Sequence, residues 1–287
     1  MVTERDNIRS LIDPRLLRAA GAPGRALDRM GTQLLFYVKA LGWMPRSVQR
    51  YKREIVRLLA EVSFGSGALA VIGGTVGVIT AMCFFTGSVV GLQGFAALNQ
   101  IGAAALTGFI TAYFNTREIA PLVSGIALSA TVGCGFTAQL GAMRISEEID
   151  ALEVMAVPSL PFLITTRIIA GLIAVVPLYV IGLVASYGSS QIVTTLFYQQ
   201  SAGTYDHYFN LFLPPEDVLW SFGKVLIFAV VVVMLHCAAG YNAQGGPAGV
   251  GVAVGQAVRA SLVSVTVLDL LLSLAIWGST TTVRIAG

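Results

Sequence analysis

Four ionisable residues interrupt long apolar stretches of the chain: Arg117, Glu118, Lys224 and Asp269. A charge at the centre of a bilayer costs about 2.5–3.5 kcal/mol on insertion scales, so such side chains usually face protein or water. We interpret Arg117, Glu118 and Lys224 as one polar mouth for a charged head group, and we include Asp269 as a weaker candidate. Each candidate has a structural alternative. Arg117 and Glu118 could form a structural pair, Lys224 could snorkel to the membrane surface, and Asp269 could be buried and hydrogen-bonded at a helix contact.

A short acidic segment, residues 144–157, lies between two apolar stretches and suggests a contact with a partner. As a helix over 146–156, it places its apolar side chains on one narrow stripe. Ser146 caps the start and Pro158 ends the helix. An exposed amphipathic helix of this kind docks into a groove on a soluble partner. The residues assigned to this docking are Glu147, Glu148, Asp150, Leu152 and Met155.

The remaining polar motifs indicate no catalytic centre or metal site. His207 and His236 are isolated in the sequence. The glycine-rich stretch 245–251 lacks the Lys-Ser/Thr ending of a P-loop, so a turn with close helix packing is the better interpretation. The cysteines lie far apart in apolar surroundings, without metal-ligand spacing: Cys83, Cys134 and Cys237. We expect no enzyme activity and no cofactor in this chain.

Composition places the chain in a membrane. Apolar residues make up 55% and charged residues 11%, against about 25% charged residues in soluble domains. Twelve of the 18 Lys and Arg residues precede residue 60. A basic flank before the first span predicts a cytoplasmic N-terminus and gives no reason to expect nucleic-acid binding. Residues 1–26 contain no apolar core of a signal peptide.

Apolar stretches predict an all-α polytopic membrane protein with about five transmembrane helices. We expect a cytoplasmic tail over 1–25, interfacial and linking helices over 26–61, and a membrane domain over 62–287. An amphipathic pattern over 26–44 favours a helix in the membrane interface, with a core helix of a cytoplasmic domain as the alternative. Residues 91–97 are read as a turn, and 99–115 as a separate helix that does not necessarily cross. The predicted spans are 64–90, 119–143, 162–189, 218–239 and 254–277.

Several motifs together resemble the MlaE/YrbE permease family over roughly residues 30–283. They are Arg117-Glu-Ile-Ala-Pro121, Gly133-Cys-Gly-Phe-Thr-Ala-Gln-Leu-Gly-Ala-Met143, Glu147-Glu-Ile-Asp-Ala-Leu-Glu-Val-Met155, Arg167, Lys224 and the glycine-rich loop. Two positions depart from the family pattern: Thr131 replaces an Arg, and Gln139 replaces a Glu. These departures look like the B-type YrbE subunit of actinobacterial Mce systems.

This resemblance implies the permease subunit of an ABC-type lipid transporter in the bacterial inner membrane. It would move hydrophobic lipids between an MCE-protein tunnel and the membrane. The implied partners are a second YrbE-type permease in a heterodimer, MCE-domain proteins, membrane lipids and a cytoplasmic ATPase that holds ATP and Mg²⁺. Two other classes stay open: an ion- or proton-coupled carrier using Glu118 and Asp269, and a non-transporting scaffold. Internal repeats would favour a carrier, and none is apparent.

Overall fold

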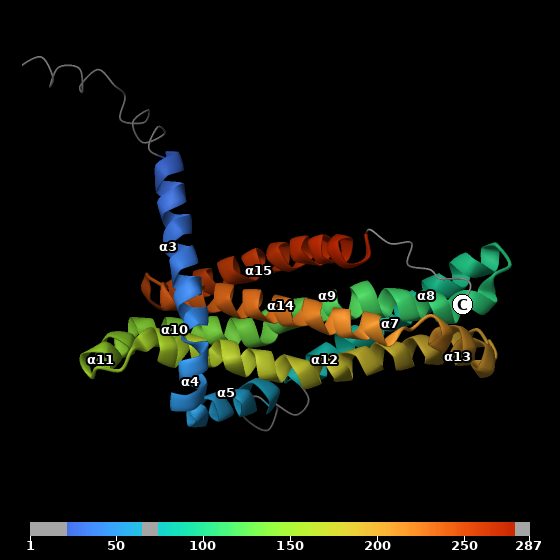
Figure 1. The fold of residues 1–287 in the computed structure, drawn as a ribbon, viewed down its shortest axis with the longest axis horizontal. Coiled ribbons are helices and arrows are strands. Elements are labelled where there is room, and N and C mark those ends of the chain that lie inside the picture. Colours follow the sequence, from blue (N-terminus) through green and yellow to red (C-terminus); the bar gives the residue numbers. More distant parts are fainter. Residues whose placement is uncertain (1–21, 65–73, 279–287) are drawn as a thin grey trace, which may run out of the picture. The chain divides into compact units, whose positions relative to one another are not determined.

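The computed structural model describes residues 22–64 and 74–278, which are mostly helical (Figure 1). No β-strand occurs in these two ranges, so the predicted all-α class is confirmed. Predictions for residues 1–21 and 65–73 fall outside the described residues. The helices are α3 (Ala22–Gly42), α4 (Met44–Arg50), α5 (Lys52–Phe64), α7 (Thr75–Gln100), α8 (Thr107–Phe114), α9 (Ala120–Leu128), α10 (Cys134–Ile145), α11 (Glu148–Val154), α12 (Thr166–Ile192), α13 (Ala202–Leu211), α14 (Pro215–Tyr241) and α15 (Gly246–Trp277).

Short turns of other helix types join several of these helices. A 3₁₀ turn, η1 (Ala104–Leu106), precedes α8. Four π-helical turns follow: η2 (Asn115–Ile119), η3 (Ser129–Gly133), η4 (Leu160–Thr165) and η5 (Val193–Phe197). Because π turns keep the chain helical while shifting its register, they join successive α-helices into longer rods.

Five helical segments in the described part are long and apolar enough to cross a membrane. They are Thr75–Gln100, Ala104–Ile145, Leu160–Phe197, Pro215–Tyr241 and Gly246–Trp277. The second and third contain 42 and 38 residues. At about 1.5 Å per residue, each is roughly twice as long as the hydrocarbon core is thick. Both segments therefore contain more residues than one crossing of the hydrocarbon core needs.

The sequence prediction was wrong in dividing the second rod at Arg117. Helical structure continues from Ala104 to Ile145, and η2 carries it past this point. Pro121 has no N–H to donate to the Arg117 carbonyl four residues earlier. The Lys224 ammonium of α14 donates to that carbonyl instead, at 2.7 Å. A long-range contact thus supplies a donor to the Arg117 carbonyl, and the helix continues past Pro121.

The first predicted span, 64–90, was also misplaced, because α7 continues to Gln100 through the predicted turn at 91–97. The glycines there serve close packing. A Cβ on Gly91 would lie 3.0 Å from the Ser190 carbonyl oxygen of α12. One on Gly87 would lie 2.5 Å from the Ser186 carbonyl oxygen. Small residues therefore let α7 and α12 approach along two turns.

Two compact units divide the chain between Trp43 and Met44. The described part of the first unit is α3, and its placement in the membrane interface stays a prediction. In the second unit, α12 is the central helix and packs against α5, α7 and α14, while α14 also packs against α10 and α15. Figure 1 shows α11 at one end of this helix bundle and α13 at the other.

Candidate functional site

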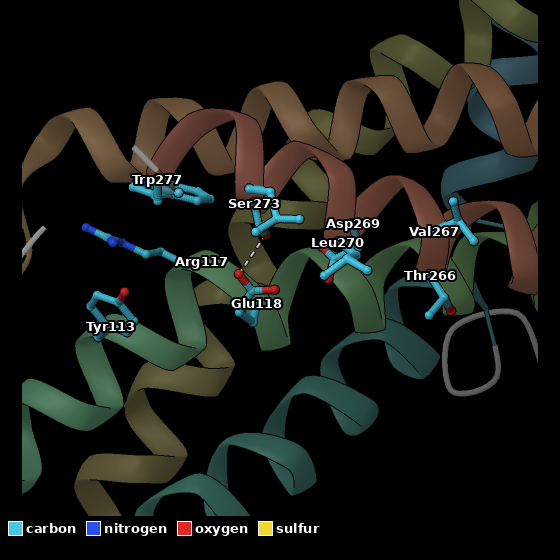
Figure 2. A pocket seen from close by; sticks show the side chains of 11 residues that line it. Tyr113, Arg117, Glu118, Thr266, Val267, Asp269, Leu270, Ser273 and Trp277 are labelled. Atoms are coloured by element: carbon cyan, nitrogen blue, oxygen red, sulfur yellow. Dashed lines mark hydrogen bonds between the residues drawn. The ribbon is translucent and has the colours of Figure 1, made fainter. Parts of the chain in front are cut away.

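A cavity of about 570 Å³ lies beside α15, towards the end of the bundle opposite α11. Its walls come from α8, η2 and α15 (Figure 2). The lining residues are Tyr113, Arg117, Glu118, Thr266, Val267, Asp269, Leu270, Ser273, Leu274, Trp277 and Gly278. Aliphatic and aromatic groups thus form much of the wall, and three ionisable side chains reach it.

Lys224 is the centre of the charge cluster behind this cavity. Its side chain is 0% exposed. The ammonium nitrogen lies 2.7 Å from each of three oxygens: the Arg117 carbonyl, Ser273 Oγ and Asp269 Oδ1. Two of these contacts are hydrogen bonds, to the Arg117 carbonyl and Ser273 Oγ, and the third is an ion pair with Asp269. Lys224 therefore does not snorkel to the membrane surface but ties α14 to η2 and α15.

Arg117 pairs with Asp217 of α14 and not with its neighbour Glu118. Its Nε and Nη2 lie 2.8 and 2.6 Å from Asp217 Oδ2. The guanidinium lies over the Tyr113 and Trp277 rings, 4.2 and 4.9 Å from their centroids. The Trp277 indole donates to the other Asp217 oxygen at 2.9 Å. Aromatic faces and a carboxylate together stabilise this buried cation.

Glu118 is the acidic group most accessible from the cavity, with a side chain 35% exposed. One carboxylate oxygen accepts a hydrogen bond from Ser273 Oγ at 2.7 Å, drawn in Figure 2. The other lies 3.7 Å from the Lys224 ammonium, longer than a hydrogen bond. Glu118 is therefore held by two neighbours while remaining open to a ligand.

The structure brings all four predicted residues, Arg117, Glu118, Lys224 and Asp269, into one cluster. Sequence reasoning missed Asp217 and Trp277. Asp217 lay just before the predicted span 218–239 and was not singled out, yet it is buried in the first turn of α14. The sequence feature that could have identified it is the pair of acidic residues directly after Pro215. Carboxylates in the first turn stabilise a helix N-terminus, so this pair indicates that the helix begins here.

The acidic segment near residue 150 forms α11, and the middle of its apolar stripe faces inward. Ile149 is fully buried and Leu152 is partly buried, whereas Val154 and Met155 are 88% and 64% exposed. The predicted docking carboxylates Glu147, Glu148 and Asp150 are exposed. Ile149 and Leu152 therefore anchor α11 to the rest of the helix bundle, and the exposed surface includes these carboxylates with Val154 and Met155. The sequence periodicity identified the apolar stripe, but it could not tell whether the chain itself or a separate partner covers it.

Ser146 does not cap α11 as expected. Glu147 precedes the helix with a φ of 60°, a left-handed conformation that turns the chain sharply. Ser146 Oγ instead donates to the Ala142 carbonyl of α10 at 3.0 Å. The far end of α11 is fixed by Ser159, which donates to the Glu153 carboxylate at 2.6 Å and lies 2.9 Å from the Tyr241 hydroxyl. Movement of α11 is therefore linked to the end of α14.

A second polar cluster surrounds Arg167, which is buried near the start of α12. Arg167 donates to the Leu163 carbonyl at 2.7 Å and to the Gln139 amide oxygen at 3.2 Å. The Gln139 amide nitrogen donates to Glu61 of α5. Gln139 thus links Arg167 to a carboxylate on another helix. One turn earlier on α5, the Arg57 guanidinium donates to Glu54 and lowers the pKa of that carboxyl.

His236, which looked isolated in the sequence, is buried between hydroxyl groups. Its two ring nitrogens lie 3.0 Å from Ser129 Oγ and 2.8 Å from Thr137 Oγ1. A Cβ on Gly133 would lie 2.5 Å from the imidazole ring, so only glycine fits there. These contacts join α14 to η3 and α10. His236 therefore acts in helix packing.

Five apolar spans around buried polar clusters define the class: the chain is a multi-pass α-helical membrane protein. A family profile described as "Permease MlaE" matches residues 64–275. The chain therefore belongs to the MlaE permease family, as its motifs indicated. The assignment to a B-type YrbE subunit stays a prediction.

Similar proteins carry permease names. The chain is 27% identical over 196 residues to a "Probable ABC transporter permease protein" of Rickettsia bellii, covering 68% of this chain and 76% of that protein. A protein of the same name from Rickettsia felis is 25% identical over 223 residues, covering 78% and 83%. "Protein TRIGALACTOSYLDIACYLGLYCEROL 1, chloroplastic" of Arabidopsis thaliana is 28% identical over 196 residues. That match covers 67% of this chain and 56% of the Arabidopsis protein, a little over half its length.

The Lys224 contacts predict a specific stability pattern. Lys224→Met leaves two carboxylates without their cation, which should cost about 3–5 kcal/mol. Adding Asp269→Asn removes one of those charges and should restore part of the loss. Ser273→Ala removes one hydroxyl partner and should cost about 1 kcal/mol. Thermal midpoints of the purified chain check this order, which would be contradicted if the double variant were no more stable than Lys224→Met.

Proposed function

We propose that the chain is the permease subunit of an ATP-driven transporter that moves hydrophobic lipids between an MCE-protein tunnel and the bacterial inner membrane. The observation that carries this proposal is the cavity beside α15, where an apolar and aromatic wall meets fixed charges. A lipid needs both surfaces, because its chains favour apolar walls and its head group needs polar partners. The Arabidopsis relative's name refers to a glycerolipid, which is consistent with a lipid substrate.

We further propose that ATP and Mg²⁺ are bound by a partner ATPase that docks on α11. The exposed carboxylates and the exposed Val154 and Met155 side chains offer this partner a mixed polar and apolar surface. Because Ile149 anchors α11 internally and Glu153 is linked through Ser159 to Tyr241, force on α11 would reach α14 directly. Lys224 and the charge cluster belong to the same helix.

A second YrbE-type permease is the partner proposed within the membrane. The most apolar stretch of α15 is only 17% buried inside the chain, the smallest share among the five described spans. Its exposed residues include Val263, Val267, Leu270, Leu271 and Leu274. Since some of these also line the cavity, a partner helix against α15 would close it on one side.

The lipid site predicts a transport defect in Glu118→Ala. Loss of a hydrogen-bonding charged group is worth about 1.5–3 kcal/mol, so lipid transport per assembled complex should fall at least about tenfold. Glu118 is the informative position because it is partly exposed, whereas a change at the buried Lys224 also disturbs assembly. Glu216→Ala, at an exposed carboxylate at the start of α14, is the matched control. A normal ratio of transport to assembled complex in Glu118→Ala would contradict the site assignment.

The docking role of α11 predicts that Met155→Asp separates the ATPase from the membrane subunits. A tag on this chain should recover an ATPase, a second permease and MCE-domain proteins from wild-type membranes. Met155→Asp should lose the ATPase and keep the others, because a charge buried in an apolar groove is costly. Gln244→Asp, in the exposed loop before α15, is the control. Full ATPase recovery with Met155→Asp would exclude this surface, and failure of wild type to recover an ATPase would favour the scaffold or carrier alternatives.

The positive charge before residue 60 predicts the orientation. The N-terminus, α11 and the loop at 242–245 should be cytoplasmic, and the loop at 198–201 should be outside. Single cysteines at Ser201 and Gln244, in a background without the three native cysteines, test this in intact cells. An impermeant thiol reagent should label Ser201→Cys at once and Gln244→Cys only after permeabilisation. The reverse pattern, or labelling of both from outside, would overturn the orientation.

A further inference from the structure

Arg259 is a cation on α15 that lies apart from the charge cluster and the cavity lining. It is exposed, although it belongs to the membrane-spanning segment Gly246–Trp277. No described residue forms an ion pair or a hydrogen bond with its guanidinium. Asp269, the other ionisable residue of α15, is about 15 Å further along the helix and contacts Lys224. An exposed charge on a membrane helix needs an anion or water beside it, so Arg259 indicates a contact outside this chain.

The depth of Arg259 in the membrane follows from the length of α15. Trp277 ends this helix and donates to Asp217, and tryptophan favours the membrane–water interface. At about 1.5 Å per residue, Arg259 lies about 27 Å from Trp277 along the helix. The hydrocarbon core of a bilayer is about 30 Å thick. With the loop at 242–245 in the cytoplasm, Arg259 therefore lies at the level of the head groups of the inner leaflet.

The surface around Arg259 offers both hydrogen-bond donors and room. Gln256, one turn earlier, is also exposed and adds an amide donor on the same side of the helix. A Cβ on Gly255 would meet no atom within 4 Å, so the helix surface beside Arg259 is open. A guanidinium presents its N–H donors in a planar fork that matches phosphate oxygens. These features suit a head group that contains a phosphate.

The face of α15 that carries Arg259 leads to the cavity. Thr266, Leu270 and Ser273 lie on this face at helical spacing and belong to the cavity wall (Figure 2). Val263, between Arg259 and Thr266, is exposed as well. One stripe of α15 therefore runs from the head-group level of the inner leaflet to the cavity.

We propose that Arg259 and Gln256 form a second head-group site, which binds the phosphate of an anionic lipid in the inner leaflet. This inference rests on the proposed lipid-transport function and adds the point at which an inner-leaflet lipid meets the permease. Charge-assisted hydrogen bonds from the guanidinium hold the phosphate, while the lipid chains lie along Val263. A lipid held there is aligned with the stripe that leads to the cavity. A zwitterionic head group binds more weakly, because its own cation offsets the attraction to Arg259.

The test uses two photoreactive phospholipids that share the same chains and differ only in the head group. One carries phosphatidylglycerol, which is anionic, and the other phosphatidylcholine, which is zwitterionic. Each has a diazirine on the chain carbons next to the head group, so that it labels protein at head-group depth. The purified complex is labelled in lipid nanodiscs, and mass spectrometry identifies the labelled residues. The anionic probe should label residues 252–263 about fivefold more than the zwitterionic probe, because one cation at the membrane surface attracts its net charge.

Arg259→Gln is the informative variant because it removes the charge and keeps a hydrogen-bonding side chain. Its labelling by the anionic probe at 252–263 should fall to that of the zwitterionic probe. Arg50→Gln, at an exposed arginine of α4, is the matched control and should keep the wild-type preference.

Equal labelling by the two probes in wild type, or an unchanged preference in Arg259→Gln, would overturn the inference. Labelling of 266–277 without labelling of 252–263 would also overturn it, because a protein partner then covers Arg259 while the lipid site in the cavity stands. If neither probe labels 252–277 above a sample kept in the dark, the proposed lipid site fails as well.

Discussion

A buried lysine ammonium is the constraint on which the charge cluster of this permease depends. Lys224 lies within a helix of high hydropathy, so its charge needs oxygen partners inside the protein. These come from two other segments: a carbonyl of η2, and Ser273 and Asp269 of α15. Pro121 makes the first partner available by withholding its own N–H. One side chain thus fixes the approach of three segments and one wall of the cavity.

Within this cluster, some charged side chains are buried in structural pairs and others remain accessible from the cavity. Arg117 turns to Asp217 and the Tyr113 and Trp277 rings, which leaves the adjacent Glu118 directed to the cavity. At the other end of the bundle, the inward stripe of α11 leaves carboxylates and Met155 exposed. Both proposed ligand surfaces therefore depend on neighbouring residues that are already paired or buried. Because α14 carries Lys224 and ends at Tyr241, it connects the two surfaces.

The sequence predicted the spans near their true positions where apolar runs are clean: 218–239 was expected for Pro215–Tyr241. It also grouped the four charges, because charges within spans must face protein or water. It could not give the Arg117–Asp217 pair, which depends on the register of helices 100 residues apart in sequence. The sequence also could not predict that the helix continues through Arg117, because a π turn has no strong sequence signal. Glycines such as Gly91 indicate a turn and close packing equally well, so the first span was misplaced.

The most direct test of this account is an experimental density map of the assembled complex with lipid retained. The account predicts head-group density beside Glu118 and Trp277, chain density along Leu270 and Leu274, and the Lys224 ammonium within hydrogen-bond distance of the Arg117 carbonyl. A cavity filled by protein side chains, with lipid density elsewhere in the complex, would contradict it.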